Sequence, residues 1–122
     1  MRTILIVDDS ESIRDLLASV LADGGYAVLT AADGRQAIRI LSTRSVDLIV
    51  TDLYMPEADG LELLITVQKM PQRPPVIAMS SQTGVMDVLH VAKRLGAKKI
   101  LRKPFPPAEL LQHAKALLGS AS

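Results

Sequence analysis

The chain has 122 residues and a formal net charge of +1 at pH 7, so its length suits one domain and its charge gives no overall attraction to nucleic acid or to an anionic membrane. It has no cysteine, which excludes disulfides and thiol chemistry, and its two tyrosines and one phenylalanine are too few for a base-stacking platform. No signal peptide or membrane-length apolar run is found, so a cytoplasmic protein is expected.

The first third of the chain predicts a strand, a helix and a second strand. Residues 4–7 form a short, wholly apolar run, which is typical of a strand buried on both faces. Apolar residues at helical spacing follow between residues 13 and 21, with Ser10 as a candidate N-cap and Gly24 near the expected end. Residues 27–29 predict a weaker strand.

The middle of the chain repeats this alternation. Asp33 and Gln36 have near-capping-box spacing in front of a second apolar helical face. A third strand is predicted over residues 46–50. Asp59 and Glu62 show capping-box spacing again, ahead of a third helix.

The last third adds two more strand–helix pairs. Residues 76–79 predict a fourth strand, followed by apolar residues at helical spacing up to a stop near Gly96. A fifth strand is expected around Ile100, where the many neighbouring basic residues favour an edge position. Pro106 and Pro107 open a final leucine-rich helix.

Five strand–helix alternations predict an α/β fold: a doubly wound, flavodoxin-like (βα)5 domain with a parallel five-stranded sheet and helices on both faces. The wholly apolar first strand and the third strand should lie near its centre. One domain is expected over residues 1–118, with a frayed tail over residues 119–122.

Chemically active side chains follow four of the predicted strands. Asp8 and Asp9 come after the first strand, Asp52 after the third, Ser80 after the fourth and Lys103 near the end of the fifth. In open α/β sheets, ligands bind beyond the carboxyl ends of the strands. If the strand order is 2-1-3-4-5, the three carboxylates converge, with a hydroxyl and an ammonium group beside them.

Three converging carboxylates need a counter-charge. At 4 Å and an effective dielectric constant near 20, each like-charged pair costs roughly 4 kcal/mol. A set of oxygen ligands without cysteine favours a hard cation, and Mg²⁺ is the natural candidate. The alternative is that these acids are ordinary surface or helix-capping residues, which suits each of them singly better than it suits all of them together.

Several motifs together resemble one known family. They are the Asp8-Asp9 pair, Asp52 followed by Met55-Pro56, and the segment 103–105 (Lys-Pro-Phe). Similar matches occur over residues 32–37, 59–63 and 96–97, so the likeness covers essentially the whole chain. On these motifs the chain resembles the receiver domains of two-component response regulators.

The resemblance implies a role for each site residue. Asp52 would be the phosphoacceptor, and Asp8 and Asp9 would bind Mg²⁺ together with Asp52 and the backbone carbonyl of Tyr54. Ser80 would take the place of the family's Ser/Thr, and Lys103 that of its lysine, whose bond to the following proline is often cis in this family.

The resemblance also implies the function. The chain would be a signalling switch that catalyses only its own phosphorylation and dephosphorylation and is not a turnover enzyme. Its phosphoryl donor would be a histidine kinase or a histidine phosphotransfer protein, and its partner a protein effector, without direct contact to nucleic acid or membrane. The kinase, the effector, a phosphorylation-dependent dimer, and whether the receiver stands alone or belongs to a longer regulator all stay open.

The chain departs from the family at three positions. Ile100 stands where an aromatic switch residue is usual, and Pro106 where a capping side chain is usual. Tyr54 is bulky, which predicts partial shielding of the phosphoryl group from water. The basic cluster of Lys93, Arg94, Lys98, Lys99 and Arg102 favours a solvated rim over a docking face for an acidic partner or a second copy.

Features of the sequence argue against three alternative functions. A Mg²⁺-dependent aspartyl-phosphate phosphohydrolase usually needs an acid two residues after its nucleophile, where this chain has Tyr54. A flavin mononucleotide binder needs a phosphate loop after the first strand, where Asp8 and Asp9 would repel phosphate. An unphosphorylated receiver-fold scaffold would not need the intact set of site residues.

Overall fold

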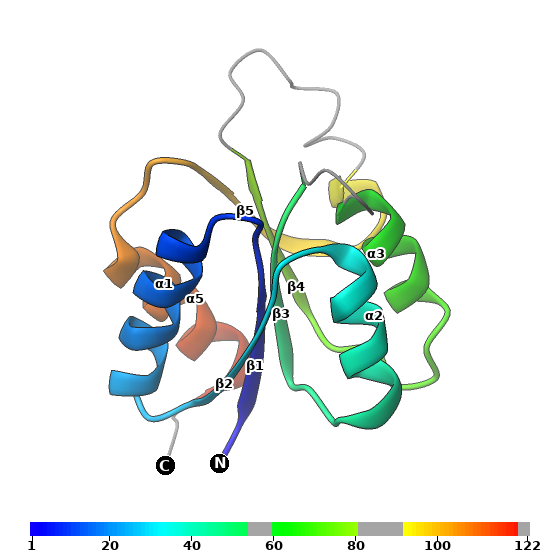
Figure 1. Cartoon of the computed structure of the whole chain (residues 1–122), viewed down its shortest axis with the longest axis horizontal. Helices are drawn as coiled ribbons and strands as arrows, with labels where there is room; N and C mark the ends of the chain where they lie inside the picture. The colour runs from blue at the N-terminus through cyan, green and yellow to red at the C-terminus, as the bar shows by residue number, and fades with distance from the viewer. Residues whose placement is uncertain (54–59, 81–91, 120–122) are drawn as a thin grey trace.

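A computed structural model of the chain describes residues 1–53, 60–80 and 92–119. In this part, a parallel sheet lies between two layers of helices (Figure 1). The elements are β1 (Thr3–Val7), α1 (Glu11–Asp23), β2 (Ala27–Ala31), α2 (Gly34–Thr43), β3 (Leu48–Asp52), α3 (Gly60–Gln68), β4 (Val76–Ser80), β5 (Ala97–Arg102) and α5 (Pro107–Leu118). None of the helices described is both long and apolar enough to span a bilayer.

The sheet has five strands in the order β2-β1-β3-β4-β5, all parallel, which confirms the predicted fold class. β3 is central and β1 is beside it, as their apolar sequences predicted. The chain places β2 on one side of β1 and then crosses over to place β3 on the other side of β1. The direction in which strands are added therefore reverses, and the switch point lies between β1 and β3. This switch point determines where a ligand site forms.

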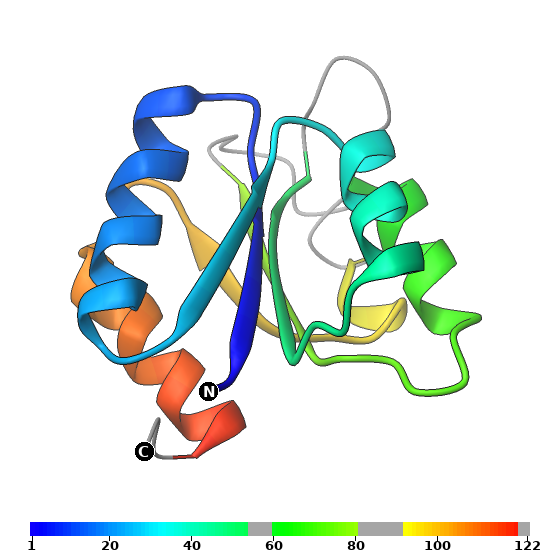
Figure 2. The ribbon, with the colours of Figure 1, turned by 60° about the horizontal axis from the view of Figure 1, so that its bottom comes forward.

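Alternation along the strands builds a separate core on each face of the sheet. On one face, Ile4 and Ile6 of β1 pack with Leu17 and Leu21 of α1 and Leu110 of α5. On the other face, the intervening strand residues pack against α2 and α3. Figure 2 shows the two layers, with α1 and α5 on one side of the sheet and α2 and α3 on the other. Because β1, β3 and β4 are covered on both faces, their carboxyl ends are rigidly held.

The expected caps of the first two helices are confirmed. The Ser10 hydroxyl accepts a hydrogen bond from the Ile13 N–H at 3.4 Å and opens α1. The Asp33 carboxylate accepts one from the Gln36 N–H at 2.8 Å, and the Gln36 side chain accepts one from the Ala32 N–H at 2.9 Å. α5 begins without a side-chain cap, because Pro106 occupies the N-cap position.

The predicted ends of the first four strands differ from the observed ones: β1 begins one residue earlier, at Thr3, and β2 runs two residues further, to Ala31. β3 begins at Leu48, two residues later than predicted, and extends to Asp52. Pairing with β1 starts where Leu48 faces Ile4, while the Asp47 carboxylate instead accepts a hydrogen bond from the Thr3 N–H at 2.8 Å. β4 also runs one residue further than predicted, to Ser80, and β5 is a full six-residue strand.

Two other expectations fall partly outside the described residues. The predicted cap at Asp59 lies outside them. The helix predicted before Gly96 also lies mostly outside them, and its described part is the helical segment 92–94.

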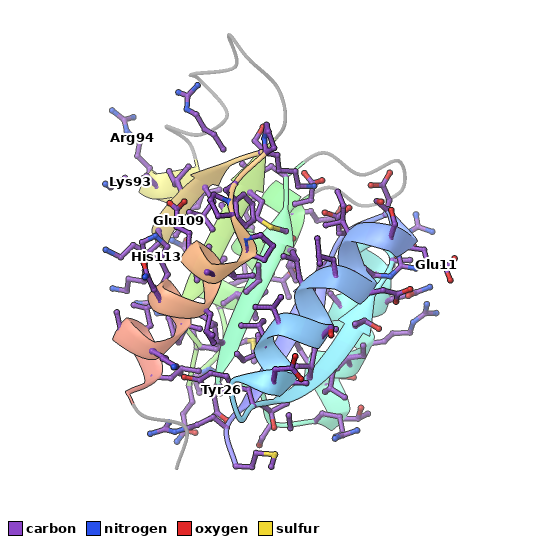
Figure 3. The ribbon with its side chains drawn as sticks, turned by 90° about the vertical axis from the view of Figure 1, so that its left-hand side faces the viewer. Glu11, Tyr26, Lys93, Arg94, Glu109 and His113 are labelled. Atoms are coloured by element: carbon purple, nitrogen blue, oxygen red, sulfur yellow. The ribbon has the colours of Figure 1, made fainter. Side chains whose placement is uncertain are left out.

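The end of α5 is fastened to the amino end of the sheet. The Tyr26 hydroxyl donates a hydrogen bond to the carbonyl of Gly119 at 3.2 Å. Tyr26 itself is buried below α1 (Figure 3). The next residue, Ala27, donates its N–H to the Arg2 carbonyl at 2.9 Å. Both ends of the domain therefore meet at the start of β2.

Candidate functional site

Three carboxylates converge at the carboxyl ends of β1 and β3, as the strand order predicted. Asp8, Asp9 and Asp52 each offer one carboxylate oxygen, and these oxygens all lie within 4.8 Å of one another. Asp8 and Asp52 are buried, at 0% and 5% exposure, whereas Asp9 is exposed. Such closely spaced acids, two of them out of water, require a positive partner.

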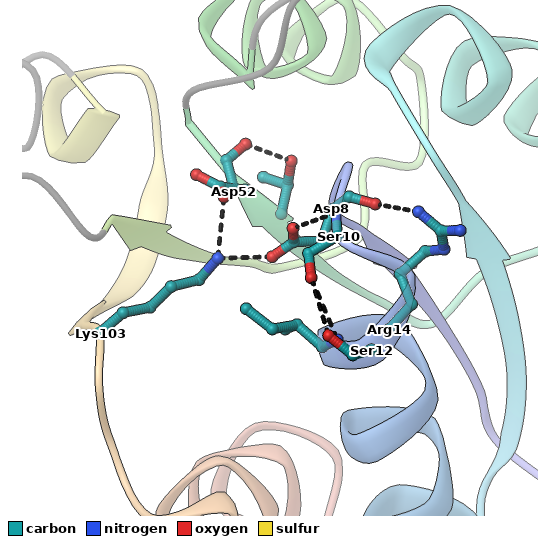
Figure 4. Close-up of polar contacts among 8 residues, drawn as sticks. Asp8, Ser10, Ser12, Arg14, Asp52 and Lys103 are labelled. Atoms are coloured by element: carbon teal, nitrogen blue, oxygen red, sulfur yellow. Dashed lines mark hydrogen bonds and ion pairs between the residues drawn. The ribbon is translucent and has the colours of Figure 1, made fainter.

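Lys103 supplies a positive charge to this cluster. Its Nζ lies 2.6 Å from Asp8 Oδ2 and 2.8 Å from Asp52 Oδ2, so one ammonium group bridges two carboxylates (Figure 4). Burial alone would lower the pKa of this ammonium, but its hydrogen bonds to Asp52 and Asp8, together with their charges, hold the pKa above its usual value. Lys103 is therefore charged at neutral pH and is not a solvated strand-end lysine.

The backbone around Lys103 holds it against β4. The Lys103 N–H donates to the carbonyl of Ser80 at 2.8 Å, which continues the pairing of β5 with β4 beyond Arg102. The peptide bond from Lys103 to Pro104 is cis, as the family resemblance implied. Ser80 is buried at 2% exposure and ends the strand next to Asp52.

Further hydrogen bonds hold the carboxylate and the backbone carbonyl of Asp8 and the backbone carbonyl of Asp52. Asp8 Oδ1 accepts a hydrogen bond from the Ser10 N–H at 2.9 Å, and the Asp8 carbonyl accepts one from Arg14 Nη1 at 2.6 Å. The carbonyl of Asp52 accepts one from the Thr51 hydroxyl at 2.9 Å. The sequence did not predict the roles of Arg14 and Thr51, because contacts to backbone atoms leave no motif. The one available signal was the position of Arg14 in the helix that begins just after the acidic pair.

The predicted site residues divide into three groups. Asp8, Asp9, Asp52 and Lys103 are brought together, and Ser80 lies at the end of the neighbouring strand. Tyr54 lies outside the described residues. Ile100 is half-buried and packs against the core on the α2–α3 face.

The donor set of the cluster fits a hard cation. The three residues offer carboxylate oxygens alone, which suit Mg²⁺ and not a soft metal. A buried carboxylate beside an ammonium group and a cation site is also an arrangement for phosphoryl transfer. The carboxylate can act as nucleophile while the positive groups neutralise the charge on the phosphoryl oxygens.

Comparison with families and curated proteins gives a consistent result. The family model described as response regulator receiver domain matches residues 4–115. The alkaline phosphatase synthesis transcriptional regulatory protein PhoP of Bacillus subtilis is 36% identical over 117 residues, covering 96% of this chain and 48% of that protein. Response regulator SaeR of Staphylococcus epidermidis is 33% identical over 122 residues, covering all of this chain and 52% of that protein. The chain thus spans about half the length of these curated relatives.

Solved structures agree with the sequence comparison. The chemotaxis protein CheY4 of Vibrio cholerae superposes with a TM-score of 0.89 at 36% identity, over 97% of this chain and 99% of that one. A CheY-like response regulator receiver domain protein from Methanospirillum hungatei gives a TM-score of 0.91 at 26% identity, over 99% of this chain and 96% of that one.

Proposed function

This chain belongs to the response regulator receiver domain family, and we propose that it is a phosphoryl-accepting switch whose acceptor is Asp52. The observation that carries the proposal is the position of the Asp52 carboxylate, which is buried, 2.8 Å from the Lys103 ammonium and clustered with Asp8 and Asp9. Few other arrangements place a nucleophilic oxygen beside both a fixed cation and an oxygen-ligand metal site.

Asp8, Asp9 and Asp52 would hold Mg²⁺, together with the backbone carbonyl of Tyr54. The bound ion would supply Lewis-acid stabilisation of the phosphoryl oxygens. Asp8, Asp9 and Asp52 support this assignment because their carboxylate oxygens lie within 4.8 Å of one another. Asp8 and Asp52 are also buried and so shielded from water. The acidic cluster also keeps a free phosphate dianion away unless its charge is neutralised, which favours a reaction that depends on the metal.

The reaction would proceed by direct attack of an Asp52 oxygen on the donor phosphorus. A new O–P bond forms while the bond from phosphorus to the donor's leaving atom breaks, and the leaving group departs with the electron pair. Lys103 would shift one hydrogen bond from Asp52 to a phosphoryl oxygen and so stabilise the acyl phosphate. The Ser80 hydroxyl would then donate to another phosphoryl oxygen and couple the phosphate to the end of β4.

The donor would be a phosphohistidine on a histidine kinase or a histidine phosphotransfer protein, and the output a changed affinity for a protein effector. The chain would accept and lose one phosphoryl group per cycle, so it acts as a switch and not as a turnover enzyme. An acyl phosphate adds charge and strong acceptor oxygens at one point, which is sufficient to bias a packed element between two arrangements.

Phosphorylation by a small donor tests the proposal. The protein is incubated with acetyl phosphate, with and without Mg²⁺, and its intact mass is recorded; one phosphoryl group adds about 80 Da. We expect an adduct that needs Mg²⁺, is absent in Asp52→Asn and persists in Asp23→Asn, which removes an exposed acid at the far end of α1. An adduct in Asp52→Asn would place the acceptor elsewhere, and absence of both an adduct and Mg²⁺ binding in the parent would leave only a scaffold.

A further inference from the structure

We infer that Arg14 is a positioning residue for the acidic pair: its guanidinium holds the peptide between Asp8 and Asp9 and so directs the Asp9 carboxylate toward the metal site beside the separately held Asp8. The metal-binding part of this inference depends on the proposed function. Arg14 is the fourth residue of α1 and half-buried, and its Nη1 lies 2.6 Å from the Asp8 carbonyl oxygen. Figure 4 shows Arg14 and Lys103 approaching Asp8 from different sides.

In the described part of the chain, the Asp8 carbonyl lies beyond the last hydrogen bond between β1 and β2. β1 ends at Val7, and the last hydrogen bond on this side runs from the Asp8 N–H to the Ala31 carbonyl at 3.1 Å. Beyond it the chain turns into α1, so the carbonyl of a wholly buried residue needs a hydrogen-bond donor from elsewhere. Arg14 reaches back from the helix and supplies that contact with a charged donor, the stronger kind of hydrogen bond.

Fixing this carbonyl also fixes the position of Asp9. The six atoms of a peptide unit lie in one plane, so the carbonyl of Asp8 and the N and Cα atoms of Asp9 move together. The Asp8 carboxylate is held separately by the Ser10 N–H and by Lys103. Arg14 thereby determines the direction in which the exposed Asp9 side chain leaves the turn.

The charge of Arg14 and its hydrogen bond predict opposite effects on metal binding. As a positive charge near the cluster, Arg14 repels Mg²⁺, so removing it would tighten binding if charge were its only influence. As a positioning group, its removal loosens the acidic pair and weakens binding. The sign of the change in Mg²⁺ affinity therefore separates the two roles.

Mg²⁺ titration of the folded chain by calorimetry provides the first test. Loss of a group that orients a metal ligand typically weakens binding about 10-fold or more, and we expect Arg14→Met to weaken Mg²⁺ binding about 10-fold. Arg14→Lys, which keeps a donor and the charge, should recover most of the affinity. Arg39→Met, which removes an exposed arginine from α2, is the matched control and should bind as the parent does.

The dependence of phosphorylation on Mg²⁺ provides a second readout. In Arg14→Met, the Mg²⁺ concentration for half-maximal phosphorylation by acetyl phosphate should rise about 10-fold. The rate at saturating Mg²⁺ should stay within about twofold of the parent, because Arg14 does not touch the reacting atoms. A general loss of folding would lower the saturating rate as well.

Amide hydrogen exchange at Ser10 tests the positioning without any metal. The Ser10 N–H donates to the Asp8 carboxylate, so its exchange rate reports the order of the turn. We expect faster exchange in metal-free Arg14→Met and parent-like exchange in Arg39→Met. Parent-like or tighter Mg²⁺ binding together with unchanged Ser10 exchange would overturn the inference. Faster Ser10 exchange in Arg14→Met than in the parent, when the parent itself fails to bind Mg²⁺, would reject the proposed function and keep the positioning role.

Discussion

Lys103 is the single side chain on which the metal-free site depends most. It lies between Asp8 and Asp52 at 2.6 and 2.8 Å and offsets the repulsion between two buried carboxylates. It therefore competes with an added cation for the same oxygens. The same ammonium has two opposed roles: it holds the site together when metal is absent, and it opposes the entry of metal.

Replacing Lys103 should separate these two roles. Lys103→Met keeps the length of the side chain and removes one positive charge, whose repulsion of a divalent ion at about 4 Å in a water-like dielectric is about 2 kcal/mol, or about 30-fold in affinity. We expect tighter Mg²⁺ binding, measured by calorimetry, together with much slower phosphorylation by acetyl phosphate. Lys115→Met on α5 is the charge-matched control. Weaker Mg²⁺ binding in Lys103→Met would show that the lysine supports the metal site instead of competing with it.

The site residues that sequence could predict are those that belong to a motif. Asp8 and Lys103 directly follow strands and Asp52 ends one, so strand order brings them together. Arg14 and Thr51 could not be found in this way, because each acts on a carbonyl of the backbone and its role depends on where that carbonyl points.

At the scale of the element, α2 depends on a single side-chain cap. The Asp33 carboxylate accepts from the Gln36 N–H at 2.8 Å, and α2 has neither an acid in its first turn nor a base in its last turn to compensate for losing it.

Removing that cap should destabilise the domain measurably. Asp33→Ala is expected to lower the free energy of unfolding by about 1 kcal/mol, because the Gln36 N–H at the helix start loses its partner. Urea denaturation measures the change. Asp33→Asn retains an acceptor and should stay within a few tenths of a kcal/mol of the parent. Equal losses in the two variants would assign the effect to the charge and not to the hydrogen bond.

β5 is an edge strand that carries its own protection against pairing with another chain. The register shifts between Val76 and Ile77, so Ala97 and Lys99 face successive residues of β4 and Lys98 is bulged out. Lys98 and Lys99 are both exposed. Figure 3 shows Lys93 and Arg94 extending from the segment before this strand. A bulge and edge lysines are common means of preventing edge-to-edge association.

Removing this protection should promote self-association. We expect the double variant Lys98→Thr with Lys99→Thr to form larger species, detected by light scattering at rising protein concentration, because a less charged edge can pair with a second copy. The same loss of charge away from this edge, in Arg35→Thr on α2 with Lys69→Thr just after α3, should leave the chain unchanged in size. A monodisperse Lys98/Lys99 variant would show that the basic residues have a different role.

The elements themselves were predictable where one signal dominated. The wholly apolar β1 and the capped α1 and α2 were found at or near their true positions. The start of β3 was wrong because Val46 continues the apolar pattern although the pairing with β1 begins only at Leu48. Strand ends depend on partners distant in sequence, and local pattern does not contain that information.

At the scale of the whole molecule, metal binding and folding are linked. The three acids come from the turn between β1 and α1 and from the end of β3, so the cluster exists only in the folded chain. Any cation that binds the cluster stabilises the whole domain by mass action.

Mg²⁺ should therefore raise the melting temperature. At ten times the dissociation constant the stabilisation is about 1.4 kcal/mol, which corresponds to a rise of about 5 °C for a domain of this size. Thermal unfolding followed by circular dichroism measures it. Asp9→Asn, which changes an exposed ligand with little cost to the fold, should abolish the rise, and Asp23→Asn should keep it. A rise that survives in Asp9→Asn would place the stabilising ion elsewhere.

The hydrogen bonds from Tyr26 to Gly119 and from Ala27 to Arg2 gather the two ends of the domain at the pole opposite the acidic cluster. A five-residue strand such as β1 separates the two poles by about 17 Å. A fluorophore, affinity tag or second domain joined to either end would thus sit clear of an incoming phosphodonor. A change in the signal of such an attachment on phosphorylation would therefore report a change that reaches the pole opposite the acidic cluster.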